Sequence, residues 1–157
     1  MKLERIRFFP TCKKARSSFL HRVVVGLGGN QGNVKNRFVK LYRMLLNDPR
    51  FFVQESSMVL QNPPFGYLDQ PDFYNAVIVL QTSLNAKALL KVLLRFEHLF
   101  GRVRLFKNGP RTLDLDIIFF DNQKIKQPNL IVPHPRWQER VSVIVPFFTL
   151  KSFKGQR

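Results

Sequence analysis

The sequence is short of cysteine, of acidic residues and of long apolar runs, and each shortage excludes a class of protein. A single cysteine, Cys12, leaves no partner for a disulfide within these 157 residues and excludes a metal site built from several cysteines. The apolar stretch 141–150 is broken by Pro146 and falls short of the roughly 18 residues that a membrane-spanning helix needs. We therefore expect a soluble, cytoplasmic protein with no membrane partner.

The shortage of acids leaves a strongly basic chain. Ten Asp and Glu stand against 26 Lys and Arg, so the formal net charge is +16. This charge attracts polyanions in general, including nucleic acid, anionic membranes and nucleotide phosphates. Seven of the basic side chains fall within the first 22 residues, against Glu4 alone. We interpret 1–21 as a basic N-terminal extension with an edge strand at 5–9, and 22–157 as a single domain. A transit peptide is the alternative for the extension, which Glu4 and Pro10 disfavour.

Hydrophobic periodicity and turn residues predict the order of the helices and strands. Asn33 and Ser83 are the expected N-caps of two amphipathic helices. In chain order, the predicted elements are a strand at 22–27, a helix at 34–47, strands at 51–60 and 73–82, a helix at 84–100 and a strand at 112–120. This β-α-β-β-α-β order is the split βαβ pattern, which predicts an α+β fold with a mainly antiparallel sheet.

Asp114 and Asp116 lie two residues apart in the last predicted strand, although acids are scarce. Side chains alternate between the faces of a strand, so both carboxylates point to one face with roots roughly 6.6–6.8 Å apart, while Leu113, Leu115 and Ile117 face the core. Two such charges repel unless cations lie between or beside them. Oxygen ligands without His or Cys nearby suit Mg²⁺ rather than Zn²⁺. The alternative is that the two acids neutralise neighbouring arginines.

Basic residues flank this strand in the sequence. Arg102, Arg104 and Arg111 precede the acids, and His134 and Arg140 follow in the segment PHPRWQER. The planar guanidinium matches phosphate oxygens, and phosphoryl transfer needs positioning and charge stabilisation rather than a covalent nucleophile. The cluster therefore indicates a phosphate site, although each arginine taken alone is equally well explained as a solvated charge.

The loop 61–72 and its flanks combine two amides, Asn62 and Asn75, with the aromatic residues Phe65 and Phe73. Amides and aromatic rings are what a pocket for a flat, hydrogen-bonding heterocycle requires. The alternative is that both phenylalanines belong to the core. The segment GLGGN lacks the endings of the common phosphate-loop motifs, so we interpret it as a tight turn.

Five segments in this order, GLGGN, NPPFGYLDQPDFYNAV, GRVR, GPRTLDLDII and VPHPRWQER, resemble the 6-hydroxymethyl-7,8-dihydropterin pyrophosphokinases of folate biosynthesis over residues 23–150. The resemblance implies a ferredoxin-like sandwich with helices packed on one face of the sheet. It also implies a transferase that moves pyrophosphate from ATP to the pterin hydroxymethyl group, releases AMP and uses two Mg²⁺ ions. The expected partners are these two small substrates, without nucleic acid, and we expect a monomer.

The resemblance also assigns roles to single residues. It implies that Asp114 and Asp116 hold the two Mg²⁺ ions, and that Arg102 and Arg111 are catalytic residues that engage the triphosphate. The positions implied for ATP binding are Glu97, Arg102, Arg104, Arg111, Ile117, His134 and Arg140. The positions implied for pterin binding are Asn62, Pro64, Phe65, Phe73, Asn75 and Asp114. The loops around 28–33, 61–72 and 105–110 are expected to close over the substrates.

This chain also departs from the family pattern. Ser142 stands where the family commonly has an aromatic residue, and Asn108 stands where it often has tryptophan. These departures leave an inactive pterin-binding homologue as one alternative. An RNA-binding module is a second, because its β-α-β-β-α-β order and positive charge are similar. The strand that would read RNA instead carries Asp114 and Asp116, and no RNA-recognition motif occurs.

Overall fold

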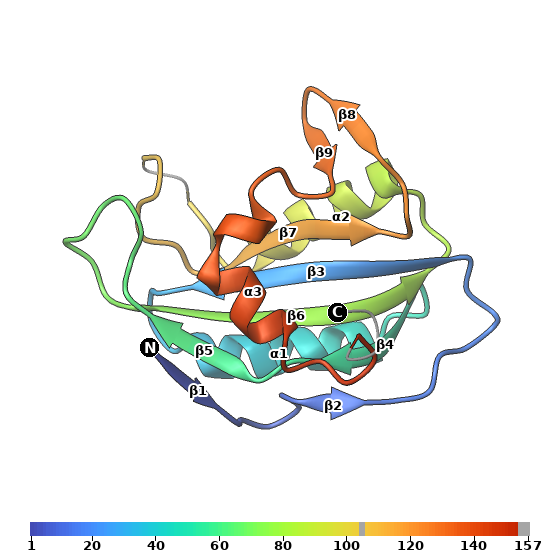
Figure 1. Cartoon of the computed structure of the whole chain (residues 1–157), viewed down its shortest axis with the longest axis horizontal. Coiled ribbons are helices and arrows are strands. Elements are labelled where there is room, and N and C mark those ends of the chain that lie inside the picture. Colours follow the sequence, from blue (N-terminus) through green and yellow to red (C-terminus); the bar gives the residue numbers. More distant parts are fainter. Residues whose placement is uncertain (104–105, 154–157) are drawn as a thin grey trace.

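An antiparallel sheet of seven strands lies at the centre of the computed structural model, which describes residues 1–103 and 106–153 (Figure 1). Its main path runs β1-β5-β6-β3-β7, while β4 also pairs with β6, and β2 pairs with β4. The strands are β1 (Lys2–Glu4), β2 (Thr11–Cys12), β3 (His21–Gly29), β4 (Phe51–Ser56), β5 (Val59–Asn62), β6 (Phe73–Thr82) and β7 (Asp114–Phe120).

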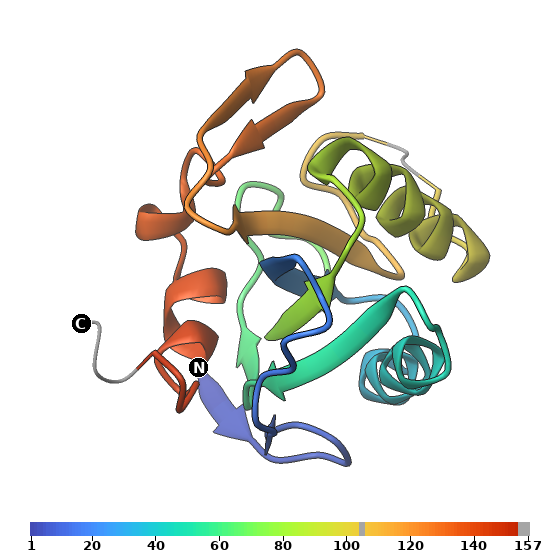
Figure 2. The same cartoon turned by 90° about the vertical axis from the view of Figure 1, so that its right-hand side faces the viewer.

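Helices cover the two faces of this sheet unequally. The long helices α1 (Val34–Leu46) and α2 (Ala86–Leu99) lie on one face, and the short α3 (Val141–Phe147) lies on the other (Figure 2). The larger apolar core lies under α1 and α2, and a smaller one, which includes Val79 and Ile118, lies under α3. The predicted α+β, ferredoxin-like fold is confirmed, and α3 is an addition that the sequence did not predict.

The remaining elements follow β7. The strands β8 (Ile125–Gln127) and β9 (Leu130–Val132) form a separate hairpin that projects from the sheet (Figure 1). A single turn of 3₁₀ helix, Trp137–Glu139, then leads into α3. Within the part of the chain that the structure describes, no helix is both long enough and apolar enough to cross a membrane.

Two predicted boundaries were wrong for local reasons. The second helix begins at Ala86 rather than near 84, because its N-cap is Asn85, whose side chain accepts a hydrogen bond from the Ala88 N–H. The predicted strand 51–60 is two strands, interrupted at Ser57. There the Ser57 hydroxyl oxygen accepts a hydrogen bond from the Val77 N–H, so a side chain takes over one position of the ladder. The first N-cap, Asn33, is confirmed.

The N-terminal residues are integrated into the sheet. Strand β1 pairs with β5, and β2 pairs with β4. The edge strand predicted at 5–9 was therefore misplaced, because the two strands lie before and after that stretch. Between them, Ile6 and Phe9 form an isolated bridge in a tight turn. The Phe9 side chain is 0% exposed and packs in the core beside Phe38 and Tyr42. The first twelve residues therefore contribute apolar burial to the domain.

Candidate active site

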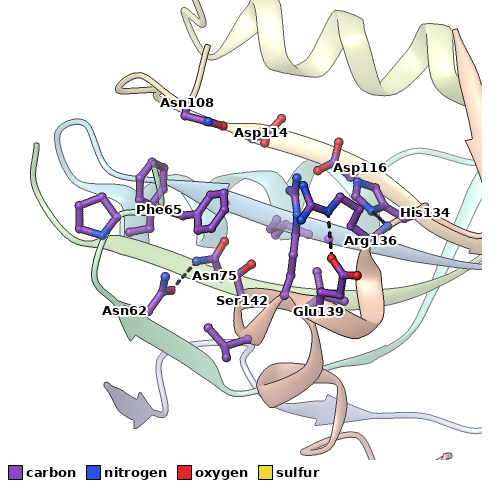
Figure 3. Close-up of a pocket in the computed structure, with 18 of the residues that line it drawn as sticks. Asn62, Phe65, Asn75, Asn108, Asp114, Asp116, His134, Arg136, Glu139 and Ser142 are labelled. Carbon is purple, nitrogen blue, oxygen red and sulfur yellow. Dashed lines mark hydrogen bonds and ion pairs between the residues drawn. The ribbon is translucent and has the colours of Figure 1, made fainter. Parts of the chain in front are cut away.

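A cavity of about 500 Å³ opens on the α3 side of the sheet (Figure 3). Its walls come from β3, the end of β5, the start of β6, β7 and the segment 134–143. Ten of the residues singled out from the sequence line it: Asn62, Pro64, Phe65, Phe73, Asn75, Arg111, Asp114, Asp116, His134 and Arg140. Residues that are far apart in the sequence thus meet around one space.

The Asp114 carboxylate is held by two arginines. Its Oδ1 accepts a hydrogen bond from Arg102 Nη1 at 2.5 Å, and its Oδ2 accepts one from Arg111 Nη1 at 3.0 Å. The same Arg102 nitrogen lies 2.8 Å from Glu97 Oε1, while Glu97 Oε2 accepts the Leu115 N–H at 2.7 Å. Burial raises the pKa of Glu97, an effect that the Leu115 N–H and Arg102 oppose. This arrangement of Asp114 matches the alternative interpretation of the sequence, in which the acid neutralises neighbouring arginines.

Asp116 differs from Asp114 in having no partner. Within residues 1–103 and 106–153, no hydrogen bond or ion pair reaches its carboxylate. Burial raises the pKa of Asp116 to about 7, and the nearby negative charges of Asp114 and Glu97 also raise it. Two carboxylates on one face, one of them unpartnered, fit a hard divalent cation, which prefers oxygen ligands and lowers the pKa of the groups it binds. The described residues hold no group of three metal-ligating side chains, so the remaining ligands would come from phosphates and water.

His134 and Arg140 border the same end of the cavity. The His134 backbone N–H donates to the Ile118 carbonyl at 2.9 Å, which fixes this segment against β7. Burial lowers the pKa of His134, and the positive charge of Arg140 lowers it further, so the ring is neutral at physiological pH. In Figure 3, His134 lies beside Asp116, away from Asn62 and Phe65. This end combines carboxylates, a guanidinium and a neutral imidazole.

The other end is suited to a flat ring. Asn75 Nδ2 donates to Asn62 Oδ1 at 2.6 Å, which sets the orientation of both amides. A Cβ atom at Gly28 would lie 2.8 Å from Asn75 Oδ1, so glycine is needed for β3 to pass this amide. The Arg111 guanidinium lies 5.1 Å from the centre of the Phe73 ring. Phe65 is 71% exposed on its loop, and its ring also borders the cavity.

The sequence did not single out Gln70, which links the loops around the cavity. Its Nε2 donates to the Asn108 carbonyl at 2.8 Å and to the Tyr67 carbonyl at 2.7 Å. Its Oε1 accepts a hydrogen bond from Asn30 Nδ2 at 2.9 Å, and Asn30 Oδ1 accepts the Arg111 N–H at 3.0 Å. One side chain therefore connects the three loops that were expected to close. The only signal in the sequence was an amide within a loop rich in Pro and Asp.

Among the described residues, three of the predicted site residues do not line the cavity. Glu97 and Arg102 reach it only through Asp114, as described above. Ile117 is buried in the core under α1 and α2, on the opposite face of β7 from the acids, and its contact with a nucleotide stays a prediction. Arg104 lies outside the described residues. Conversely, the cavity is also lined by residues that were not assigned a role: Met1, Asn108, Arg136, Glu139, Val141, Ser142 and Val143.

Comparisons with known proteins show which family the chain belongs to. The family model of 7,8-dihydro-6-hydroxymethylpterin-pyrophosphokinase matches residues 24–152. The 2-amino-4-hydroxy-6-hydroxymethyldihydropteridine pyrophosphokinase of Campylobacter jejuni is 48% identical over 144 residues, which cover 91% of each chain. The protein of the same name from Helicobacter pylori is 44% identical over 142 residues, covering 89% of this chain and 87% of that one.

Some relatives are longer. The folic acid synthesis protein fol1 of Pneumocystis carinii is 39% identical over 129 residues, which cover 82% of this chain but 17% of that protein. The match to the family model, residues 24–152, includes every described residue predicted for the site, and the two bacterial relatives cover about nine-tenths of this chain. This chain belongs to the 7,8-dihydro-6-hydroxymethylpterin-pyrophosphokinase family.

Proposed function

We propose that this protein transfers pyrophosphate from ATP to the hydroxymethyl group of 6-hydroxymethyl-7,8-dihydropterin in folate biosynthesis, releases AMP and depends on Mg²⁺. The observation that carries the proposal is the division of one cavity into two ends. One end holds Asp114, Asp116 and the arginines, and the other holds Phe73 with the Asn62–Asn75 amide pair. The chain's membership of the pyrophosphokinase family supports this chemistry.

At the ring end, the amides of Asn62 and Asn75 have free donor and acceptor positions for the edge of the pterin. Phe73 offers an apolar face, and the nearby Arg111 guanidinium connects this face to the phosphate end. Holding the hydroxymethyl group and the β-phosphate in one orientation converts an encounter of two substrates into a reaction within one complex. These residues therefore act by positioning.

At the phosphate end, Asp114 and Asp116 would hold Mg²⁺, and the bound ion would supply positive charge that screens the ATP phosphates. A cation on Asp114 competes with its two arginines. Arg102 and Arg111 would then turn their guanidiniums from Asp114 to the triphosphate oxygens, which they match in geometry. His134 and Arg140 add donors at the same end. In this proposal, Arg102 and Arg111 pair with Asp114 before the substrates bind, and the same two arginines stabilise the charge that develops on the phosphates.

The loops contribute by excluding water. Gln70 joins the loop 61–72 to Asn30 and Asn108, so the three segments can move over the substrates together. A closed site limits hydrolysis of ATP and strengthens the electrostatic interactions inside it. An RNA-binding role is not favoured, because the sheet face that would stack bases carries two acids and is partly covered by α3.

The test is product analysis. The protein is incubated with ATP, Mg²⁺ and the reduced pterin, and the nucleotides and pterins are separated by chromatography. We expect AMP and pterin diphosphate in equal amounts, and no product when Mg²⁺ is chelated. The appearance of ADP, or pterin binding without turnover, would contradict the proposal; the second result would identify the chain as an inactive homologue.

A further inference from the structure

Residues ahead of the family match reach the substrate cavity. In β1, Lys2 lies opposite Gln61 and Leu3 lies opposite Leu60, so residue 1 comes level with Asn62 at the end of β5. Met1 is among the residues that line the cavity. Figure 1 shows the N-terminal mark beside the end of β5, where the loop 63–72 begins. Strand β1 is thus the outer neighbour of the strand that delivers a ring-binding amide.

The start of α3 borders the cavity at the same end. Val141, Ser142 and Val143 line it, and α3 packs against β5. In Figure 2 the N-terminal mark also lies close to α3. Ser142 is small and leaves room for another side chain.

Strand β1 is held in place by several contacts. Glu4 forms an ion pair with Lys35 of α1, and the Lys35 ammonium lies 5.1 Å from the centre of the Tyr74 ring. Five residues further along, Phe9 anchors the turn in the core. The segment is therefore ordered before any ligand arrives, which reduces the entropy that binding must offset.

We propose that Met1, which β1 holds beside the end of β5, forms a wall of the pterin end of the cavity, and that its side chain packs against the bound heterocycle. This inference rests on the proposed function. Met1 is 75% exposed, so its apolar surface gains burial when a flat ring enters. Its unbranched thioether adapts to irregular space and makes favourable contacts with aromatic rings. The phosphate-binding groups lie at the other end, so the wall acts on the pterin and not on ATP.

The experiment compares two substitutions, Met1→Gly and Met1→Leu, each made by cleaving a fusion tag in front of residue 1. The unsubstituted chain is prepared in the same way. We expect Met1→Gly to raise KM for the pterin by on the order of tenfold, the effect of losing one apolar contact in a pocket. KM for ATP and kcat should stay within about twofold. Met1→Leu, which keeps an apolar side chain, should restore pterin KM to nearly the unsubstituted value.

Glu4→Gln is the matched control, because it removes the ion pair of the same strand without changing the cavity lining. It should leave pterin KM unchanged. The inference is overturned if Met1→Gly has the KM of the unsubstituted chain, or if Glu4→Gln raises KM equally, since strand support would then explain the effect. Failure of the proposed function has a different signature, namely no AMP from the unsubstituted chain. In that case a fluorescence titration measures the affinity of each chain for the pterin. Equal affinities for Met1→Gly and the unsubstituted chain would overturn the inference that Met1 contacts the pterin.

Discussion

The two faces of β7 are opposite in character although they belong to one strand. Leu115 and Ile117 face the core under α1 and α2 and are almost fully buried. Asp114 and Asp116, which alternate with them, face a cavity that is also lined by the start of α3. On the first face desolvation would oppose any charged side chain, whereas on the second two arginines stabilise the charge of Asp114.

This difference shows how stability and chemistry can share a strand without conflict. The period of two assigns alternate residues to alternate tasks, so a change on one face leaves the other face in place. The faces are coupled at one point, where buried Glu97 accepts the Leu115 N–H and also binds Arg102, the partner of Asp114. Substitutions on β7 and around it test this separation.

Asp116→Asn should have the largest effect, on activity alone. It removes the unpartnered carboxylate, and we expect kcat to fall by about a hundredfold to a thousandfold, as with the loss of one group that stabilises transition-state charge. The melting temperature should be unchanged or higher, because the substitution breaks no hydrogen bond or ion pair among the described residues and the raised pKa of Asp116 reports a cost of ionisation. Product assay and calorimetry measure the two effects.

Asp121→Asn is the control for this substitution. Asp121 follows β7 directly, but it accepts hydrogen bonds from His21 and from the Arg22 N–H, away from the cavity. Activity should persist while stability decreases slightly. A fully active Asp116→Asn variant would show that the carboxylate has no catalytic part.

Leu115→Ala should show the reverse pattern. Truncating this buried side chain leaves a void in the core and should lower the free energy of unfolding by about 2–5 kcal/mol. The Leu115 N–H, which Glu97 accepts, is kept. Below the melting temperature, kcat per folded molecule should stay within about twofold. Denaturant unfolding followed by the product assay checks this, and a large loss of kcat in folded protein would mean that the faces are not separable.

Gln70→Ala should have a smaller effect, confined to the cavity side. It removes the hydrogen bonds that tie Asn30 and Asn108 together, so the loops hold Arg111 less firmly. We expect kcat to fall by about tenfold, which corresponds to about 1.4 kcal/mol of activation free energy. Stability should change little, because Gln70 lies in a loop and outside the core. Steady-state kinetics and thermal unfolding provide the comparison.

The exposed Gln123 offers a matched glutamine in the turn after β7, where its backbone N–H bonds the Phe120 carbonyl. Gln123→Ala should leave kcat unchanged. If Gln70→Ala lowered kcat no more than this control, the side chain would have no positioning role.

The element order and much of the site were predictable because local rules decide them. The alternation of Leu115 with Asp114 and Asp116 correctly predicted which face of β7 is buried. The helical spacing over 34–47 predicted the buried face of α1, although Leu46, which was counted on that face, is exposed. The N-cap at Asn85 and the break at Ser57 were missed. Each depends on a single side-chain hydrogen bond, and neighbouring residues in the sequence are equally plausible candidates to form it. Gln70 was missed because three loops must fold before its amide has partners.

Motif and periodicity thus decide the family, the sheet and the two acids, since these depend on neighbours in the sequence or on alternation along one strand. Only the tertiary structure gives the two acids different surroundings. Arg102 and Arg111 both reach Asp114, while Asp116 has no partner in the part of the chain that is described. It also brings Met1 beside Asn62, because β1 pairs with a strand some sixty residues away, and no local pattern specifies that pairing.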